Sequence, residues 1–199
     1  MQEQRQNDEI LDPELLLAAY CAGYFPMAES KDGSIHWFSP DPRAILELDE
    51  FRVPRSLRQT IQKQKYEITV NSAFEDVMRY CGNREETWIS ETIVQSYCKL
   101  HQLGYAHSVE AWYSNKLVGG LYGVAIGGAF FGESMFSTMS DASKVCLVFL
   151  VNRMKERGFT LLDVQYVNPH LLRFGAKEIP RSQYLKCLQH AIKKQCSFL

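Results

Sequence analysis

The chain has 199 residues, 46% of them hydrophobic and 23% charged, and a net charge of -1. This length suits one compact domain or two small ones, with a core that needs no disulfide or structural metal. The near-neutral charge excludes a global basic field for nucleic acid, so any such binding requires a local patch. The six cysteines form no C-x-x-C pair, there is no run of 18 apolar residues, and the N-terminus lacks the apolar core of a secretion signal. We therefore expect a cytoplasmic protein with reduced thiols and no membrane segment.

The first part of the chain predicts a small helix-and-strand unit. Residues 12–23 predict a helix, because an aspartate N-cap and a proline at the first helical position precede an apolar stripe that a glycine ends. Two prolines within 37–43 impose an extended course, and 43–48 alternates as a strand. Trp37 lies on this course, where it suits either core packing or the rim of a pocket.

A basic segment follows at 52–65, which contains five basic residues and no acidic one. Pro54 starts a short helix there, and residues three apart on a helix share a face. Such a face is usually only solvated; the alternative is a patch that binds phosphates. Its candidate residues are Arg55, Arg58, Lys63 and Lys65.

The remainder of the chain reads as helices, then a mainly antiparallel sheet, then a helix that crosses to a further strand. Asn71 is the expected cap of the helix that ends near Cys81, and turn residues separate the three central strands. The predicted elements are a strand at 66–70, helices to 81 and over 90–103, strands at 106–113, 117–125 and 129–136, a helix from 140 or 141 to 157, a strand at 160–166, a turn or short helix from 168, and a helix over 180–194. This order predicts an α+β fold, with a small N-terminal domain at 1–64 and a second domain at 65–199.

Three polar residues interrupt apolar strands, and buried polar groups need partners or a task. Glu133 stands among aromatic residues beside a glycine, which permits close backbone approach. Asp163 and Gln165 are two apart, so an extended strand would direct both side chains to one face. A carboxylate beside an amide can hold an amine or hydroxyl between them, although a structural pair is an equal alternative.

Other familiar reaction centres are missing from the sequence. The segment 137–144 has no glycines to cradle a pyrophosphate, and no G-x-x-x-x-G-K-[ST] or G-x-S-x-G motif occurs. The five histidines show no metal-ligand spacing. We therefore expect neither a metal nor a cofactor.

Six motifs in order resemble the leucyl/phenylalanyl-tRNA–protein transferases over about residues 10–190. They are LLAAY (16–20) with GYFP (23–26), WFSPDPR (37–43), FGESMFS (131–137), ASK (142–144), DVQ (163–165), and PHL (169–171) with GA (175–176). The resemblance implies a small N-terminal domain and a C-terminal domain with an N-acetyltransferase-like fold. It also implies transfer of Leu, Phe or, less efficiently, Met from aminoacyl-tRNA to proteins with N-terminal Arg or Lys, which marks them for N-end-rule degradation. Because the ester is already activated, positioning and charge stabilisation suffice.

The resemblance also implies roles for individual residues. Asp163 and Gln165 would polarise and hold the attacking amine, and Glu133 would lie close to the aminoacyl group. Trp37 and Trp88 would contact the terminal adenosine or the pocket rim, and the basic residues of 52–65 would meet acceptor-stem phosphates. The pocket for the transferred side chain would be lined by Phe130, Gly132, Met135, Leu147, Leu150 and Leu162.

Two other functions compete with this one. An acyl-CoA-dependent N-acetyltransferase would need the glycine-rich loop that the sequence lacks, and a binding module without catalysis would not need Glu133, Asp163 and Gln165. We expect Asp163→Ala to abolish transfer while folding and tRNA binding are kept, and we expect a monomer.

Overall fold

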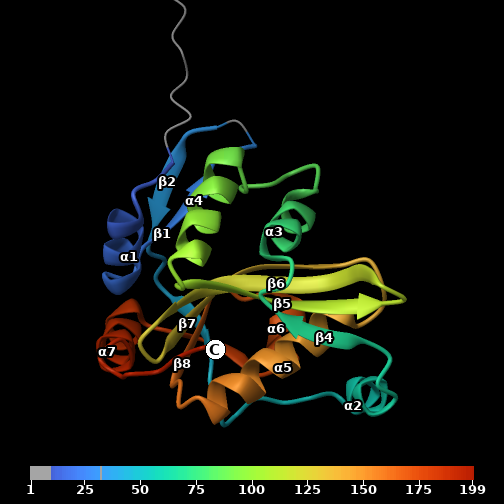
Figure 1. Cartoon of the computed structure of the whole chain (residues 1–199). Coiled ribbons are helices and arrows are strands. Elements are labelled where there is room, and N and C mark those ends of the chain that lie inside the picture. Colours follow the sequence, from blue (N-terminus) through green and yellow to red (C-terminus); the bar gives the residue numbers. More distant parts are fainter. Residues whose placement is uncertain (1–9, 32) are drawn as a thin grey trace, which may run out of the picture.

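The computed structural model describes residues 10–31 and 33–199. The expectation that the chain has no secretion signal concerns its N-terminal end, which lies outside the described residues. The helices are α1 Pro13–Cys21, α2 Arg55–Gln62, α3 Phe74–Gly82, α4 Glu91–Gln102, α5 Ala142–Glu156, α6 Pro169–Leu172 and α7 Arg181–Ala191 (Figure 1). The strands are β1 Phe25–Ala28, β2 Ile35–Phe38, β3 Arg43–Leu46, β4 Glu67–Val70, β5 Ala106–Tyr113, β6 Lys116–Ile126, β7 Ala129–Ser137, β8 Leu161–Gln165 and β9 Ala176–Ile179.

A seven-stranded sheet in the order β4-β5-β6-β7-β8-β3-β9 forms the centre of the molecule, and β1 pairs with β2 separately. Every neighbouring pair in the large sheet is antiparallel except β7 and β8, which are parallel and joined through α5. A parallel pair requires such a crossover. The predicted α+β class with a mainly antiparallel sheet is confirmed.

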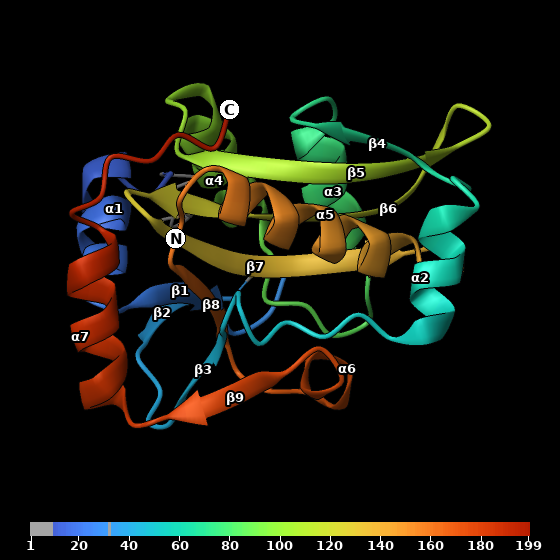
Figure 2. The ribbon, with the colours of Figure 1, turned by 90° about the horizontal axis from the view of Figure 1, so that it is seen from below.

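Helices cover both faces of this sheet. In Figure 1, α3 and α4 lie on one side of β5 and β6 and α5 lies on the other, and Figure 2 shows α5 lying over the sheet between β5 and β7 and running along these strands. Each side has its own apolar core: Tyr20, Phe74 and Tyr97 belong to one, and Leu57 and Leu147 to the other. The arrangement follows from amphipathic helices that bury their apolar stripes against a sheet.

The sheet opens between β7 and β8. These strands pair only over Ala129–Phe131 and Leu161–Asp163, and both continue beyond that point. A bulge lies on β7 at Glu133, because Tyr122 of β6 pairs with Ser134 while the next residue, Gly123, pairs with Gly132. A Cβ on Gly123 would come within 2.2 Å of the Phe131 carbonyl oxygen. Beyond Phe131 and Asp163, β7 and β8 are no longer hydrogen-bonded to each other, and side chains there can face the gap between these two strands.

Several local predictions are corrected. The sequence does not predict β9 or the β1–β2 hairpin, because strands of four residues are too short to establish a pattern. Asn71 does not cap α3, whose N-cap is Ala73; its side chain instead accepts the backbone N–H of Ser108. Asn71 lies two residues before the N-cap position, and its φ of 59° falls in the left-handed region.

The division of the chain at residue 64 stays a prediction. β3 precedes that position and yet lies between β8 and β9, so the N-terminal segment supplies an inner strand of the large sheet. Within 10–31 and 33–199, no helix has the length and apolar character needed to cross a bilayer.

Candidate active site

A cavity of about 270 Å³ occupies the gap between β7 and β8; we call it the strand-gap cavity. Its walls are mostly apolar, and a few polar groups converge in it, as in many binding sites. It is lined by Met27, Arg84, Trp88, Leu121, Tyr122, Gly132, Glu133, Ser134, Met135, Leu147, Leu150, Leu162, Val164, Gln165, Tyr166, Asn168 and Leu171.

Glu133 on β7 lies at the centre of a hydrogen-bond network in this cavity. Its carboxylate accepts hydrogen bonds from the hydroxyl of Tyr20 at 2.7 Å, the amide Nε2 of Gln165 at 2.9 Å and, more weakly, the hydroxyl of Tyr97 at 3.4 Å. The two tyrosine hydroxyls are also hydrogen-bonded to each other. Burial raises the pKa of Glu133 from 4.5 to about 8, against the opposing effect of the Tyr20 hydrogen bond. A pKa of about 8 favours the protonated form of this carboxyl at neutral pH.

Asp163 on β8 is fully buried and does not line the strand-gap cavity. Its carboxylate accepts two hydrogen bonds from Arg43, at 3.0 Å from Nε and 2.6 Å from Nη2, and one from the hydroxyl of Tyr184 at 2.7 Å. Arg43 is 1% exposed, and its Nη1 donates to the Gly23 carbonyl at 3.0 Å. The aspartate is thus neutralised by a bidentate partner and has no access to a ligand in the cavity.

Gln165 connects these two groups. Its backbone N–H donates to Asp163 Oδ1 at 2.9 Å, while its side-chain Nε2 donates to Glu133. Its φ is 64°, in the left-handed region that non-glycine residues seldom adopt. The expectation that Asp163 and Gln165 share one face assumed extended dihedrals, and this φ turns the Gln165 side chain into the cavity while Asp163 stays in the core.

The structure brings most of the other predicted pocket residues together, and two lie elsewhere. Trp88, Gly132, Met135, Leu147, Leu150 and Leu162 all line the strand-gap cavity. Phe130 is fully buried and packs on Phe198 with ring centroids 5.2 Å apart, and it does not reach the cavity. Trp37 packs against the apolar core from β2, and Met27 of the paired strand lines the cavity instead.

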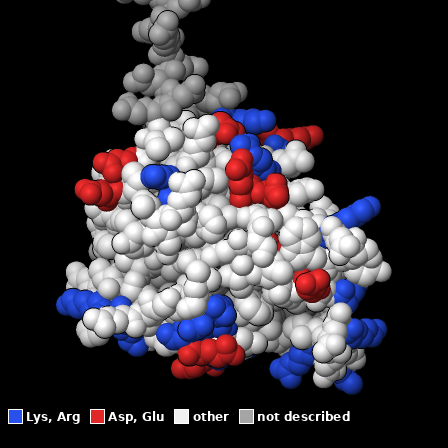
Figure 3. Space-filling view, viewed as in Figure 1, with Lys and Arg blue, Asp and Glu red and all other residues white. Residues whose placement is uncertain are grey.

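The predicted basic residues lie on and after α2. Arg55, Arg58, Lys63 and Lys65 are all exposed, and Arg58 Nε donates to the Val53 carbonyl at 3.0 Å. Figure 3 shows Lys and Arg side chains gathered in the lower right of the view, where Figure 1 draws α2. These residues therefore form an exposed positive surface outside the strand-gap cavity.

Sequence reasoning did not single out Tyr20, Tyr97, Arg43 or Arg84 as site residues. A signal for Arg43 was present, because an arginine that opens an apolar strand is buried only with a carboxylate partner. The tyrosines carry no comparable signal, since their positions on α1 and α4 also suit ordinary core packing.

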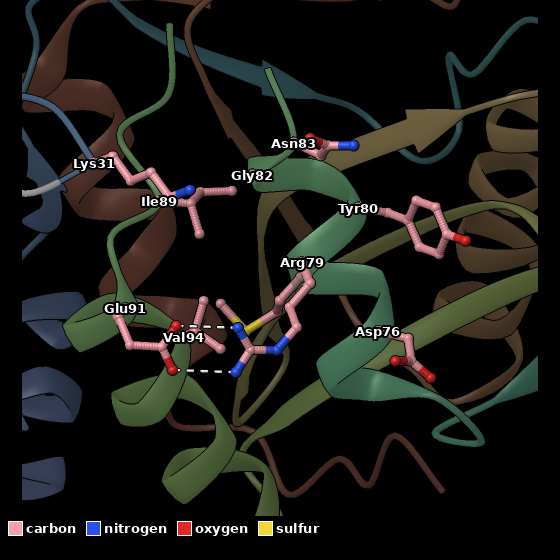
Figure 4. A pocket seen from close by; sticks show the side chains of 10 residues that line it. Lys31, Asp76, Arg79, Tyr80, Gly82, Asn83, Ile89, Glu91 and Val94 are labelled. Atoms are coloured by element: carbon pink, nitrogen blue, oxygen red, sulfur yellow. Dashed lines mark hydrogen bonds and ion pairs between the residues drawn. The ribbon is translucent and has the colours of Figure 1, made fainter. Parts of the chain in front are cut away.

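A second hollow, the α3–α4 cavity, has a volume of about 340 Å³ and is shown in Figure 4. The loop at 83–90 borders both cavities, because Asn83 and Ile89 line this one while Arg84 and Trp88 line the other. The main polar residue of the α3–α4 cavity is Arg79, which forms exposed ion pairs with Glu91 at 3.0 Å and with Glu75 at 2.7 Å. Exposed pairs of this kind contribute little to stability and form no reaction centre.

Chemically, the strand-gap cavity can hold an amine beside Glu133 and Gln165 and an apolar side chain against its leucine walls. Glu133 can donate or accept a hydrogen bond, and Gln165 can orient an N–H donor through its remaining amide oxygen. Across the described part of the chain, no group of three His, Cys, Asp or Glu side chains is arranged to hold a metal ion.

Comparisons with known proteins give consistent matches. A family model described as leucyl/phenylalanyl-tRNA protein transferase matches residues 45–189, and one for the N-terminal domain of the same family matches residues 9–41. The leucyl/phenylalanyl-tRNA–protein transferase of Gloeobacter violaceus is 51% identical over 188 residues, which are 94% of this chain and 97% of that protein. That of Herpetosiphon aurantiacus is 53% identical, with 94% and 96% covered. Among solved structures, L-PGS from Bacillus licheniformis matches with a TM-score of 0.43 and 15% identity over 78% of this chain and 51% of that one, so this chain spans about half its length.

Proposed function

The chain belongs to the leucyl/phenylalanyl-tRNA protein transferase family, and on that premise we propose that its strand-gap cavity moves Leu, Phe and, less efficiently, Met from aminoacyl-tRNA to an N-terminal Arg or Lys of an acceptor protein. The family makes it an aminoacyltransferase that acts between tRNA and protein. The product would carry a new N-terminal residue that marks it for N-end-rule degradation.

The reaction exchanges an ester for an amide. The neutral α-amino nitrogen of the acceptor attacks the ester carbonyl carbon, a C–N bond forms, and the C–O bond to the terminal ribose breaks. The nitrogen loses one proton, and the released ribose oxygen gains one. Because the ester supplies the driving force, the chain's task is to hold the two substrates in line and to stabilise the charge that develops.

Gln165 is the residue best suited to hold the attacking amine. Its Nε2 is occupied by Glu133 at 2.9 Å, so its Oε1 is the atom that can accept an N–H from the acceptor. Glu133, with its pKa near 8, can hydrogen-bond the amino group of the aminoacyl donor through its carboxyl oxygens. Asp163 would act through Gln165, whose backbone it fixes, and not by touching the substrate.

The apolar wall would receive the transferred side chain. Leu147, Leu150 and Leu162 face the cavity beside Met135, and they offer no polar partner to a charged or amide side chain. Such a wall selects by size, at about 1–3 kcal/mol for each methylene. Trp88 at the same cavity would stack on the terminal adenosine, and the exposed basic residues of α2 would meet the acceptor-stem phosphates.

The observation that carries this proposal is the Glu133–Gln165 hydrogen bond inside an otherwise apolar cavity. The test measures labelled Leu or Phe transferred from charged tRNA to a peptide that begins with Arg, with an Ala-initiated peptide as control. We expect transfer to the Arg peptide alone, and we expect Gln165→Ala to reduce it at least 100-fold, roughly the effect of removing a positioned catalytic group.

Two outcomes would favour the other functions. Labelling of the peptide from acetyl-CoA but not from tRNA would identify an N-acetyltransferase. Binding of charged tRNA without transfer from either donor would leave a binding module.

A further inference from the structure

We infer that Arg84 binds the 5′-phosphate of the donor's terminal nucleotide and thereby fixes the direction in which the donor enters the strand-gap cavity. This inference rests on the proposed function and assigns a new contact within the same site. The residue belongs to the loop at 83–90 between α3 and α4, the loop that also carries Trp88 into the cavity.

The guanidinium of Arg84 is held in place at the cavity. Its Nη2 donates to the Met135 carbonyl at 2.6 Å, on the strand that carries Glu133 two residues earlier. The other end of the loop is also fixed, because the Trp88 carbonyl accepts the backbone N–H of Ala28 at 3.2 Å. The arginine is thus anchored to β7 and the tryptophan to β1, and both residues line the same cavity.

Charge distinguishes Arg84 from the other lining residues. Among the described residues that line the cavity, Arg84 is the only Lys or Arg, and Glu133 is the only Asp or Glu. Across residues 10–31 and 33–199, Arg84 forms no ion pair and makes one side-chain hydrogen bond. A guanidinium has five N–H donors in a planar fork, so most of them remain available to an oxyanion.

The chemistry of the donor supplies one matching anion. In an aminoacylated terminal nucleotide, base, ribose and ester are neutral, the amino group is cationic, and the 5′-phosphate carries the negative charge. The cavity offers a matching arrangement, with a cation for the phosphate on the 83–90 loop and a carboxyl that can accept a hydrogen bond from the amino group on β7. Arg84 would take the phosphate, Trp88 the base and Glu133 the amino group, so that the ester lies near Gln165.

The experiment compares two small donors, 3′-O-phenylalanyl-adenosine and the same compound with a 5′-phosphate, using an Arg-initiated peptide as acceptor. We expect the wild type to have the higher kcat/KM with the phosphorylated donor. Arg84→Gln should lower kcat/KM for that donor at least about tenfold, the loss that one charge-assisted hydrogen bond implies, and leave the other donor within about twofold. Arg84→Lys, which keeps the charge but loses the fork, should fall between them.

Arg79→Gln is the matched control, because it removes the same charge from the α3–α4 cavity five residues away (Figure 4). It should not change the preference between the two donors. A measurement without turnover repeats the comparison: quenching of tryptophan fluorescence by adenosine 5′-monophosphate should weaken in Arg84→Gln, and quenching by adenosine should not.

Three results would overturn the inference. An equal loss with both donors would mean that Arg84 shapes the loop, and a change confined to the KM of the acceptor peptide would assign it to the acceptor. No change with either donor would leave it without a role in binding. Failure of the proposed function is distinct, since the wild type would then transfer from neither donor.

Discussion

Replacing Asp163 with alanine is expected to damage the fold as well as the reaction. Arg43, whose side chain is 1% exposed, would lose its carboxylate partner, and the Tyr184 hydroxyl would lose its acceptor. Breaking a buried ion pair on one side costs about 3–5 kcal/mol, out of a total stability of about 5–15 kcal/mol. This differs from the expectation drawn from the sequence, in which folding would be kept.

The assay is urea unfolding followed by the fluorescence of Trp37, Trp88 and Trp112. With an m-value of about 2 kcal/mol/M, a loss of about 4 kcal/mol lowers the midpoint by about 2 M. The double variant Arg43→Met with Asp163→Leu removes both charges and should recover at least half of that shift. The reasoning is refuted by an Asp163→Ala midpoint within about 0.3 M of wild type, or by a double variant whose loss is the sum of the two single ones.

Three further predictions follow from other parts of the site. Because folded Glu133 keeps its proton up to a pKa of about 8 while the unfolded side chain releases it near 4.5, its contribution makes stability fall as pH rises from 4.5 to 8; Glu133→Gln should flatten the pH dependence of the urea midpoint across that window. Leu147→Phe makes the strand-gap cavity smaller, so kcat/KM should drop about tenfold more for the Phe donor than for the Leu donor. Equal losses would mean that the transferred side chain does not bind against Leu147. Arg55→Gln with Arg58→Gln should weaken tRNA binding and make the slope of log K against log salt shallower by about 1–2, and an unchanged slope would remove α2 from the tRNA surface.

The elements could be predicted from the sequence where periodicity and turn chemistry agree. The three central strands are separated by Ser114-Asn115, which both have positive φ, and by Gly127, as the turn residues suggested. The helix over 90–103 begins at its predicted cap, since Ser90 Oγ accepts the Ile93 N–H at 3.3 Å. Short strands such as β9 escaped because four residues carry too little pattern.

The site could be predicted only in part, because two of its features depend on contacts distant in sequence. The polar residues in apolar strands marked Glu133, Asp163 and Gln165 as candidates, and the structure places Gln165 Nε2 at 2.9 Å from Glu133. That Asp163 faces away could not be foreseen, since it follows from the left-handed Gln165 and from an arginine 120 positions earlier. Tyr20 likewise reaches Glu133 from 113 positions away.

The bond between Tyr20 and Glu133 limits how this protein could be divided or recombined. Helix α1 supplies one hydrogen bond to the carboxyl in the cavity, and the Gly23 carbonyl just after it holds Arg43. A fragment that begins after α1 would therefore lose the hydrogen bond from Tyr20 to Glu133 together with the packing of this helix. A chimera that exchanges the first 25 residues must retain this bond and the one between Arg43 and the Gly23 carbonyl. Residues of α1 that contact the site should accordingly covary with residues around β7, because a substitution in one segment alters the contacts of the other.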